Sequence, residues 1–358
     1  MRPTPEKVTL KLIAERAGTS IGTVDRALSN RPGINQKTKD HILSVARDLG
    51  YRPNKFASAL SRKRIIRLGI VYPTVPDGFY HYIDQGVDRA IQELTPYGVQ
   101  IEKLRYLSQN LSDQADLLQS LDTNAYDGLA INAAGPLTVS HINAISLTGT
   151  PVITFNTDAA ESSRLFFIGN DSLQSGRMGA ELLGRMLGGS GNVTVLGNFA
   201  QVTPFSERFA GFCDVIHNEF PDIALYPCAE CYSKSSLAAK NLIETLTQVP
   251  NMRGVFCTGY SSTVGAITAL KTLKRKDIVL IGYDVGEEIF RGIAEGYCDA
   301  ILFQDPYRQS YEAAHALVRN ILEGWLPTQP KLHIETQIVL KQNMESYRTG
   351  VVRWDLST

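Results

Sequence analysis

The sequence predicts a small all-α helix-turn-helix headpiece followed by an α/β domain of two lobes, each a parallel sheet flanked by helices. Three observations lead to this prediction. Two short amphipathic segments separated by a turn glycine stand near the N-terminus. From residue 67 onward, apolar runs of strand length alternate with helical stretches. Basic residues are concentrated in the first 64 positions.

The headpiece prediction depends on residues 10–29, which read LKLIAERAGTSIGTVDRALS. Apolar spacing places Ala14 on the inner face of a first helix and Val24 on that of a second. Gly18 supplies the backbone freedom that a tight turn needs. Ser20 can cap the second helix through its hydroxyl. Such a pair lays its second helix in the DNA major groove, and an αα-hairpin in a helical bundle is the alternative.

A third helix and a linker complete the N-terminal region. Asn35 is expected to cap the third helix, and Gly50 to end it. Residues 55–64, KFASALSRKR, have helical composition but are too few to hold a helix alone in water. A frayed linker is therefore the alternative to a short helix there.

The charges of the chain are divided unevenly. Residues 1–64 hold 14 Lys or Arg and 5 Asp or Glu, a formal charge of +9. The whole chain of 358 residues is neutral, so the remainder carries −9. A basic head suits a polyanion such as DNA, and an acidic body repels it. A merely solvated charged surface is the alternative, but it explains one helix more easily than a whole domain.

The rest of the chain alternates between strands and helices. Strands are expected at 68–72, 100–104, 128–131, 152–155, 192–196, 223–226, 255–257, 279–282, 300–303 and 334–340. Helices are expected at 82–94, 173–187 and 307–322, among others. Continuous apolar strands favour parallel sheets covered on both faces, with right-handed crossovers. The strands are too many for one typical sheet, so two lobes are expected.

Several classes of protein are disfavoured. Five cysteines, at 213, 228, 231, 257 and 298, do not suggest a disulfide framework, and packing cysteines are favoured over a redox pair at 228 and 231. Neither a signal peptide nor a membrane span is recognisable, so we expect the cytoplasm. No nucleotide-binding, hydrolase or zinc-protease motif is found, so we expect no enzyme, no cofactor and no metal site.

Separate motifs in the expected order carry a family resemblance. VTLKLIAERAGTSIGTVDRALS, GYRPN and KFASALSRKR resemble the headpiece of the LacI/GalR (lactose-repressor) family of bacterial transcription regulators. Residues 69–72, 151–155, 167–171, 208–212 and 281–284 resemble the periplasmic sugar-binding fold, in the branch of ribose-binding protein. The resemblance covers nearly the whole chain.

The resemblance implies a division of the chain. It places the DNA-binding domain at 1–53, a hinge helix or linker at 54–65, a two-lobed effector and dimerisation domain at 66–345, and a tail at 346–358. Lobe 1 is expected at about 66–165 and 305–332, and lobe 2 at about 166–304 and 333–345. The tail has no heptad pattern for a tetramerising coil.

The resemblance also implies DNA contacts. It assigns major-groove base edges to Ile21, Gly22 and Arg26, and phosphate contacts to Thr9, Ser20, Thr23 and Asn30. In the hinge it implies contacts by Ala57 and Leu60, with Leu60 wedged between bases of the minor groove. Gly22 has no side chain, so one usual base reader is absent. For Ser20, helix capping remains the alternative role.

Effector residues are expected beyond the carboxyl ends of the strands, where open α/β sheets bind ligands. A polyol needs planar hydrogen-bonding groups and an aromatic face. The candidates are Phe79, Tyr80, Asn156, Asp158, Ser206, Tyr232, Tyr260, Asp284 and Gln304. Asp158 and Asp284 could instead cap the following helices, and Tyr80 could pack between lobes.

Three departures from the family pattern affect the expected pocket. Asn156-Thr157 stands where the family often has Asp-Arg, Ser206 where it usually has a ligand arginine, and Gly259-Tyr260 where it has Asn-Asp. We therefore expect a pocket that lacks two cations and at least one anion of the family pattern.

These observations favour a sequence-specific transcriptional repressor that binds a near-palindromic operator as a homodimer. A sugar or polyol-like effector bound between the lobes would control it. The alternative is a sugar-binding or transport-associated protein with a vestigial head.

Overall fold

The computed structural model describes residues 8–28, 32–50, 65–107, 111–197 and 203–348. The chain divides into two compact units, Met1–Lys63 and Arg64–Thr358, which are described in turn. In these described ranges, no helix is long and apolar enough to cross a lipid bilayer.

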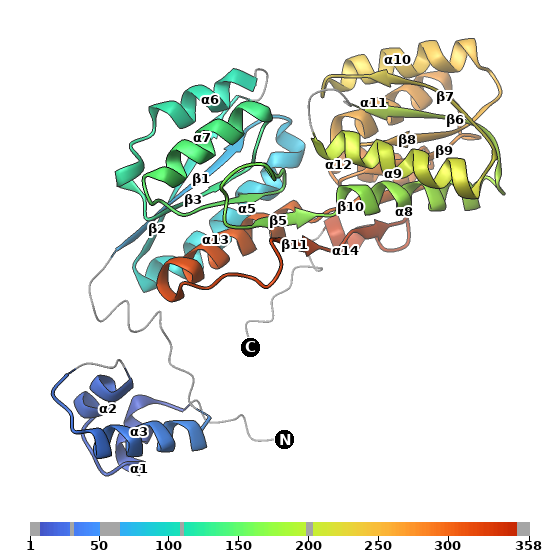
Figure 1. The fold of residues 1–358 in the computed structure, drawn as a ribbon. Coiled ribbons are helices and arrows are strands. Elements are labelled where there is room, and N and C mark those ends of the chain that lie inside the picture. Colours follow the sequence, from blue (N-terminus) through green and yellow to red (C-terminus); the bar gives the residue numbers. More distant parts are fainter. Residues whose placement is uncertain (1–7, 29–31, 51–64, 108–110, 198–202, 349–358) are drawn as a thin grey trace. The chain divides into compact units, whose positions relative to one another are not determined.

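The described part of the first unit is a bundle of short helices (Figure 1). They are α1 (Leu10–Arg16), α2 (Ile21–Leu28) and α3 (Gln36–Asp48). Their inner faces form a small core of Ile13, Ala14, Val24, Ala27, Ile42 and Ala46. Ala14 and Val24 face this core as predicted, which confirms the helix-turn-helix pairing of α1 with α2.

The turns and caps of this unit follow from the residues predicted to form them. Gly18 has φ +61°, the left-handed conformation that favours glycine. The Ser20 hydroxyl accepts a hydrogen bond from the Thr23 N–H at 3.2 Å. The Asn35 side chain accepts one from the Thr38 N–H at 2.8 Å. Each cap satisfies a backbone donor that the helix itself leaves without a partner.

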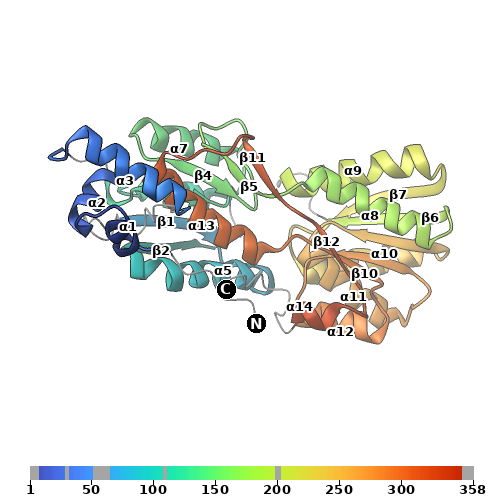
Figure 2. The same ribbon diagram turned by 90° about the horizontal axis from the view of Figure 1, so that it is seen from below.

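The second unit contains two sheets, which define two lobes (Figures 1 and 2). Lobe 1 has the strand order β11-β5-β4-β3-β1-β2, with every neighbouring pair parallel. Lobe 2 has the order β12-β10-β9-β8-β6-β7, parallel except for the antiparallel pair β10 and β12. The lobe 1 strands are β1 (Ile66–Pro73), β2 (Val99–Tyr106), β3 (Gly128–Ile131), β4 (Val152–Phe155), β5 (Phe167–Asn170) and β11 (Lys331–Ile334). The lobe 2 strands are β6 (Ser190–Gly197), β7 (Asp222–Glu230), β8 (Met252–Cys257), β9 (Val279–Tyr283), β10 (Ala300–Phe303) and β12 (Gln337–Val339).

Helices cover both faces of each sheet. In lobe 1 they are α5 (Asp77–Leu94), α6 (Leu111–Ser120), α7 (Pro136–Leu147) and α13 (Pro306–Glu323), with short 3₁₀ turns η1 (Thr95–Tyr97) and η2 (Thr123–Ala125). In lobe 2 they are α8 (Ser172–Met186), α9 (Thr203–Glu219), α10 (Ser235–Gln248), α11 (Tyr260–Leu273), α12 (Glu287–Glu295) and α14 (Met344–Arg348). Figure 2 shows the resulting layers. Because both faces are covered, strands such as β10 are buried at every residue, which explains their continuous apolar sequence.

Three segments cross between the lobes. The first and the third lie a few residues later than the predicted lobe boundaries. Strand β5 pairs with β4 and β11, so lobe 1 extends to Asn170 rather than to about 165. The second crossing follows β10, near 304, as expected. The third follows β11, which ends at Ile334 rather than near 332. The strand expected at 334–340 is shorter in the structure: β12 covers Gln337–Val339, and Ile334 ends β11 in the other sheet.

The cysteines whose side chains the structure describes are packing residues. Cys231, Cys257 and Cys298 are buried free thiols, and Cys213 is a half-buried one. In the part of the chain that the structure describes, no group of three or more His, Cys, Asp or Glu side chains is placed to hold a metal ion.

Candidate functional site

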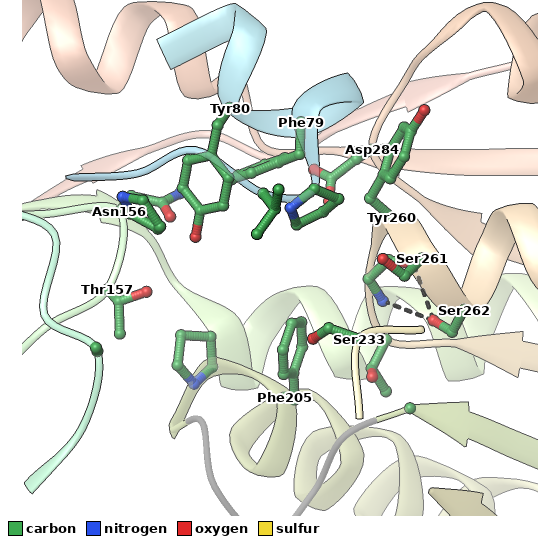
Figure 3. Close-up of a pocket in the computed structure, with 18 of the residues that line it drawn as sticks. Phe79, Tyr80, Asn156, Thr157, Phe205, Ser233, Tyr260, Ser261, Ser262 and Asp284 are labelled. Carbon is green, nitrogen blue, oxygen red and sulfur yellow. Dashed lines mark hydrogen bonds between the residues drawn. The ribbon is translucent and has the colours of Figure 1, made fainter. Parts of the chain in front are cut away.

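A cavity of about 730 Å³ lies between the two lobes (Figure 3). It opens where strands of both sheets reach their carboxyl ends, as the fold predicts. Lobe 1 contributes the ends of β1, β3 and β4 and the first turns of α5, and lobe 2 contributes the ends of β6 to β10. Seven of the nine predicted effector residues line it: Phe79, Tyr80, Asn156, Tyr232, Tyr260, Asp284 and Gln304.

Aromatic rings form part of the wall. Phe79 and Tyr80 extend from α5, with ring centroids 5.0 Å apart in an edge-to-face arrangement. Phe205 of α9 lies across the cavity from them (Figure 3). The Tyr106 hydroxyl, at the end of β2, accepts a hydrogen bond from Gln114 at 3.0 Å. Such rings can cover the C–H face of a small ring-shaped ligand.

A chain of amide hydrogen bonds connects the lobes at the floor of the cavity. Asn132 donates to the Asn156 side-chain oxygen at 2.8 Å. Asn156 donates in turn to Gln309 at 2.9 Å and to Gln304 at 3.4 Å. Gln304 donates to the Asp284 carboxylate at 3.0 Å. Any ligand that bonds to Asn156 or Asp284 therefore acts on a network that both lobes share.

Asp284 is the enclosed carboxyl group of the site. It follows β9 with φ +64°, and Asn156 follows β4 with φ +60°. Residues in this sparsely populated conformation are concentrated at functional sites. Burial raises the pKa of the Asp284 carboxyl to about 6, although Arg208, Gln304 and the Tyr260 N–H favour its charged form. Asp284 does not cap α12, whose N-cap is Gly286, so that alternative is wrong.

Arg208 supplies the pocket with a cation that sequence analysis missed. Its guanidinium donates to the Thr258 carbonyl at 2.8 Å and to Gln304 at 3.1 Å. It also lies 4.0 Å from the centroid of the Tyr283 ring. Its Nε atom is buried without a hydrogen-bond partner. The two positions at which the family has cations still hold Thr157 and Ser206, but α9 adds the cation Arg208 two residues beyond Ser206.

Two predicted effector residues lie outside the cavity lining. Asp158 forms a forked ion pair with Arg164, whose Nη2 donates at 2.6 Å and whose Nε also donates. It accepts a further hydrogen bond from Thr154 at 2.6 Å, so its oxygens are already occupied. The Ser206 hydroxyl donates to the Thr203 carbonyl at 2.9 Å, within its own helix.

Some residues of the site were not predicted, and they differ in whether the sequence could have identified them. Pro204, Phe205 and Arg208 share one face of α9, a helical spacing that could have been read. Gln309 of α13 does not line the cavity but supports its wall, since its side-chain N–H donates to the Gln304 carbonyl at 2.6 Å. Nothing local distinguishes Gln309, because only the packing of α13 against β4 brings it to Asn156.

The predicted DNA contacts that the structure describes lie on or beside α2. Ile21, Gly22 and Arg26 are exposed, opposite the buried Val24 and Ala27. The Ser20 and Thr23 hydroxyls lie 2.9 Å apart, within hydrogen-bonding distance. Thr9 caps α1 by accepting from the Leu12 N–H at 3.3 Å. Asn30, Ala57 and Leu60 lie outside the described residues.

Comparisons with known proteins match both units. A family of bacterial regulatory proteins, the lacI family, matches residues 9–54, and a periplasmic binding protein domain matches residues 68–324. The "Probable HTH-type transcriptional repressor ExuR" of Bacillus subtilis is 26% identical over 286 residues, covering 77% of this chain and 81% of the relative. The sucrose operon repressor of Streptococcus mutans is 26% identical over 280 residues, covering 76% and 81%.

Solved structures of sugar-binding proteins are similar to the second unit in fold. An ABC transporter solute binding protein from Burkholderia graminis, in complex with D-arabinose, superposes with a TM-score of 0.74 at 22% identity. The match covers 79% of this chain and 97% of that protein, and it shows the fold alone.

Proposed function

We propose that the chain is a cytoplasmic, sugar-responsive transcriptional repressor. It belongs to the periplasmic binding protein domain family through residues 68–324, and its residues 9–54 match the lacI family of bacterial regulatory proteins. The observation that carries the proposal is the presence of two sites in one chain. One is the exposed face of α2 in a basic headpiece, and the other is a polar cavity shared by two lobes. The proposal assigns no catalytic role to either site.

The headpiece would bind DNA as half of a homodimer on a near-palindromic operator. Arg26, at the exposed end of α2, can donate two hydrogen bonds to a guanine or contact a phosphate. Ile21 is 49% exposed and can contact the methyl group of a thymine. Thr9, Ser20, Thr23 and Asn30 would contact phosphates, and Ala57 and Leu60 would contact the minor groove.

The cavity would bind a sugar or polyol. Asp284, Asn156 and Gln304 offer carboxylate and amide groups to paired hydroxyls, and Phe79 and Tyr80 offer ring faces. Arg208, which also lines the cavity, would add the positive charge of its guanidinium group. A ligand that bonds to both lobes favours one arrangement of them, and this shifts the linker at 54–65 between states that bind or release DNA.

The DNA part of the proposal is tested by the salt dependence of binding. The probe is a duplex that the wild-type protein selects from a random library. Binding should weaken steeply as salt rises, because phosphate-bound counterions are released on association. Arg26→Ala should weaken binding about 10-fold to 100-fold, the cost of one specific guanine contact.

Lys240→Ala is the matched control for this test, since it also removes one exposed positive charge, but from α10. It should leave DNA affinity unchanged. A salt slope near zero, or equal losses for Arg26→Ala and Lys240→Ala, would contradict the proposed DNA interface.

A further inference from the structure

A tyrosine of lobe 2 reaches the bare backbone of lobe 1 at one edge of the cavity. Tyr260 is the first residue of α11, and its ring lies beside Asp284 and near Phe79 (Figure 3). Its hydroxyl donates to the Glu288 carboxylate at 3.2 Å, so the side chain is held by its own lobe. Opposite it stands Gly78, in the first turn of α5.

Gly78 leaves room for this ring and for nothing more. A Cβ atom at Gly78 would overlap the Tyr260 hydroxyl and Cζ and would lie 2.9 Å from Cε1. On the other side of the ring, a Cβ atom at Gly286 would lie 2.8 Å from Cε2. Neither position needs glycine for its backbone, because Gly78 is within a helix and Gly286 has an extended φ of 175°. The shared reason for both glycines is space for the Tyr260 ring.

A second contact joins the same two elements. Tyr82, one turn further along α5, packs against the apolar core of lobe 2, to which α11 and α12 contribute. The first turns of α5 therefore meet lobe 2 at Tyr260 and at Tyr82. The same turns carry Phe79 and Tyr80, which line the cavity. Closing this contact brings those two rings to the ligand.

We propose that Tyr260 acts as a clasp, a positioning residue that holds the two lobes closed against Gly78 and thereby sets the affinity of the effector site. The effect on the affinity for an effector rests on the proposed function. The contact that holds the two lobes closed does not. A ligand that binds the closed arrangement has an apparent Kd equal to its intrinsic value divided by the closed fraction. A clasp that raises the closed fraction therefore tightens binding, beyond any contact that Tyr260 makes with the ligand as a lining residue.

Small-angle X-ray scattering of the full chain, without ligand, tests the clasp directly. Gly78→Ala should raise the radius of gyration, because the added methyl group displaces the ring and opens the lobes. Tyr260→Ala should raise it too, and adding Gly78→Ala to Tyr260→Ala should change nothing further. Tyr260→Phe removes the hydroxyl that meets Gly78 and Glu288 but keeps the ring, so it should raise the radius of gyration less than Tyr260→Ala does. Asp77→Ala, an exposed neighbour of Gly78, is the control and should also match it.

The clasp is overturned if Gly78→Ala scatters like the wild type, or if its effect is the same with and without Tyr260. Circular dichroism of each variant checks that the lobes remain folded. A titration with a neutral sugar that raises the Tm of the wild type gives a second readout. Gly78→Ala should raise the apparent Kd about tenfold if the closed fraction falls by that factor, and an unchanged Kd would count against the clasp. Absence of selective DNA binding by the wild type, with the scattering pattern as expected, would contradict the proposed function and leave the clasp standing.

Discussion

Asp284 shows how a single residue can serve binding at the expense of folding. Its carboxyl group is 2% exposed, with Gln304 and the Tyr260 N–H as donors and no ion pair among the described residues. Burial raises its pKa to about 6, above the usual value of about 3.9. Between these two values the folded chain binds more protons than the unfolded chain, so stability falls as the pH rises through that range.

We predict that Asp284→Asn stabilises the second unit at pH 7 and abolishes effector binding. Each pKa unit corresponds to about 1.4 kcal/mol, so the gain in the free energy of unfolding is at most about 3 kcal/mol. The asparagine oxygen can still accept from Gln304. The gain should shrink as the pH falls toward 4, where Asp284 is protonated in the folded chain and about half protonated in the unfolded chain. Urea unfolding of both proteins at pH 4 and pH 7 measures the difference.

Asp158→Asn is the matched control for Asp284, because it changes the same group in a different environment. Asp158 is paired with Arg164, so losing its charge should destabilise the chain, by about 1–3 kcal/mol. If Asp284→Asn is less stable than the wild type at pH 7, the buried Asp284 carboxylate does not destabilise the folded chain.

At the scale of single elements, local patterns predict what local forces determine. The caps at Ser20 and Asn35, the turn at Gly18 and most strands follow from spacing and propensity, and the structure has them. Seven of the nine predicted effector residues line the cavity because each follows a strand or begins a helix at the carboxyl edge of a sheet.

The errors arise where a contact outside the predicted strand or strand end decides the role of a residue. Asp158 also follows a strand, but Arg164, six residues later, occupies its oxygens. The apolar run at 334–340 is divided because the chain crosses between lobes at 335–336, which no local pattern records. Arg208 was missed because its position on α9, rather than any strand end, brings it to the cavity.

We predict that Asn35→Ala destabilises the headpiece and leaves the lobes unaffected. The substitution removes the hydrogen bond from the Thr38 N–H at 2.8 Å, which should cost about 1 kcal/mol. Asn35→Asp retains a capping oxygen and is the control. Thermal unfolding followed by NMR signals of the headpiece should show a lower Tm for Asn35→Ala alone. Equal Tm values for the two variants would mean that the cap does not stabilise α3.

At the scale of the whole molecule, the distribution of charge and the connections between the lobes assign the two proposed binding sites to different parts of the chain. The first 64 residues carry a formal charge of +9 and the remainder −9, so a polyanion is attracted to one end and repelled from the other. Two lobes joined by three crossings enclose a cavity whose polar network belongs to both. A dimer would present two headpieces to one operator, and the cavity would determine how firmly they bind.

The affinity of the full chain for its selected duplex and for random duplex, with and without a sugar that raises its Tm, tests the central claim most directly. We predict a preference for the selected duplex of about 10³-fold or more at physiological salt, and a clear change in that affinity when the sugar is added. Equal affinity for both duplexes, in the presence and absence of the sugar, would contradict it.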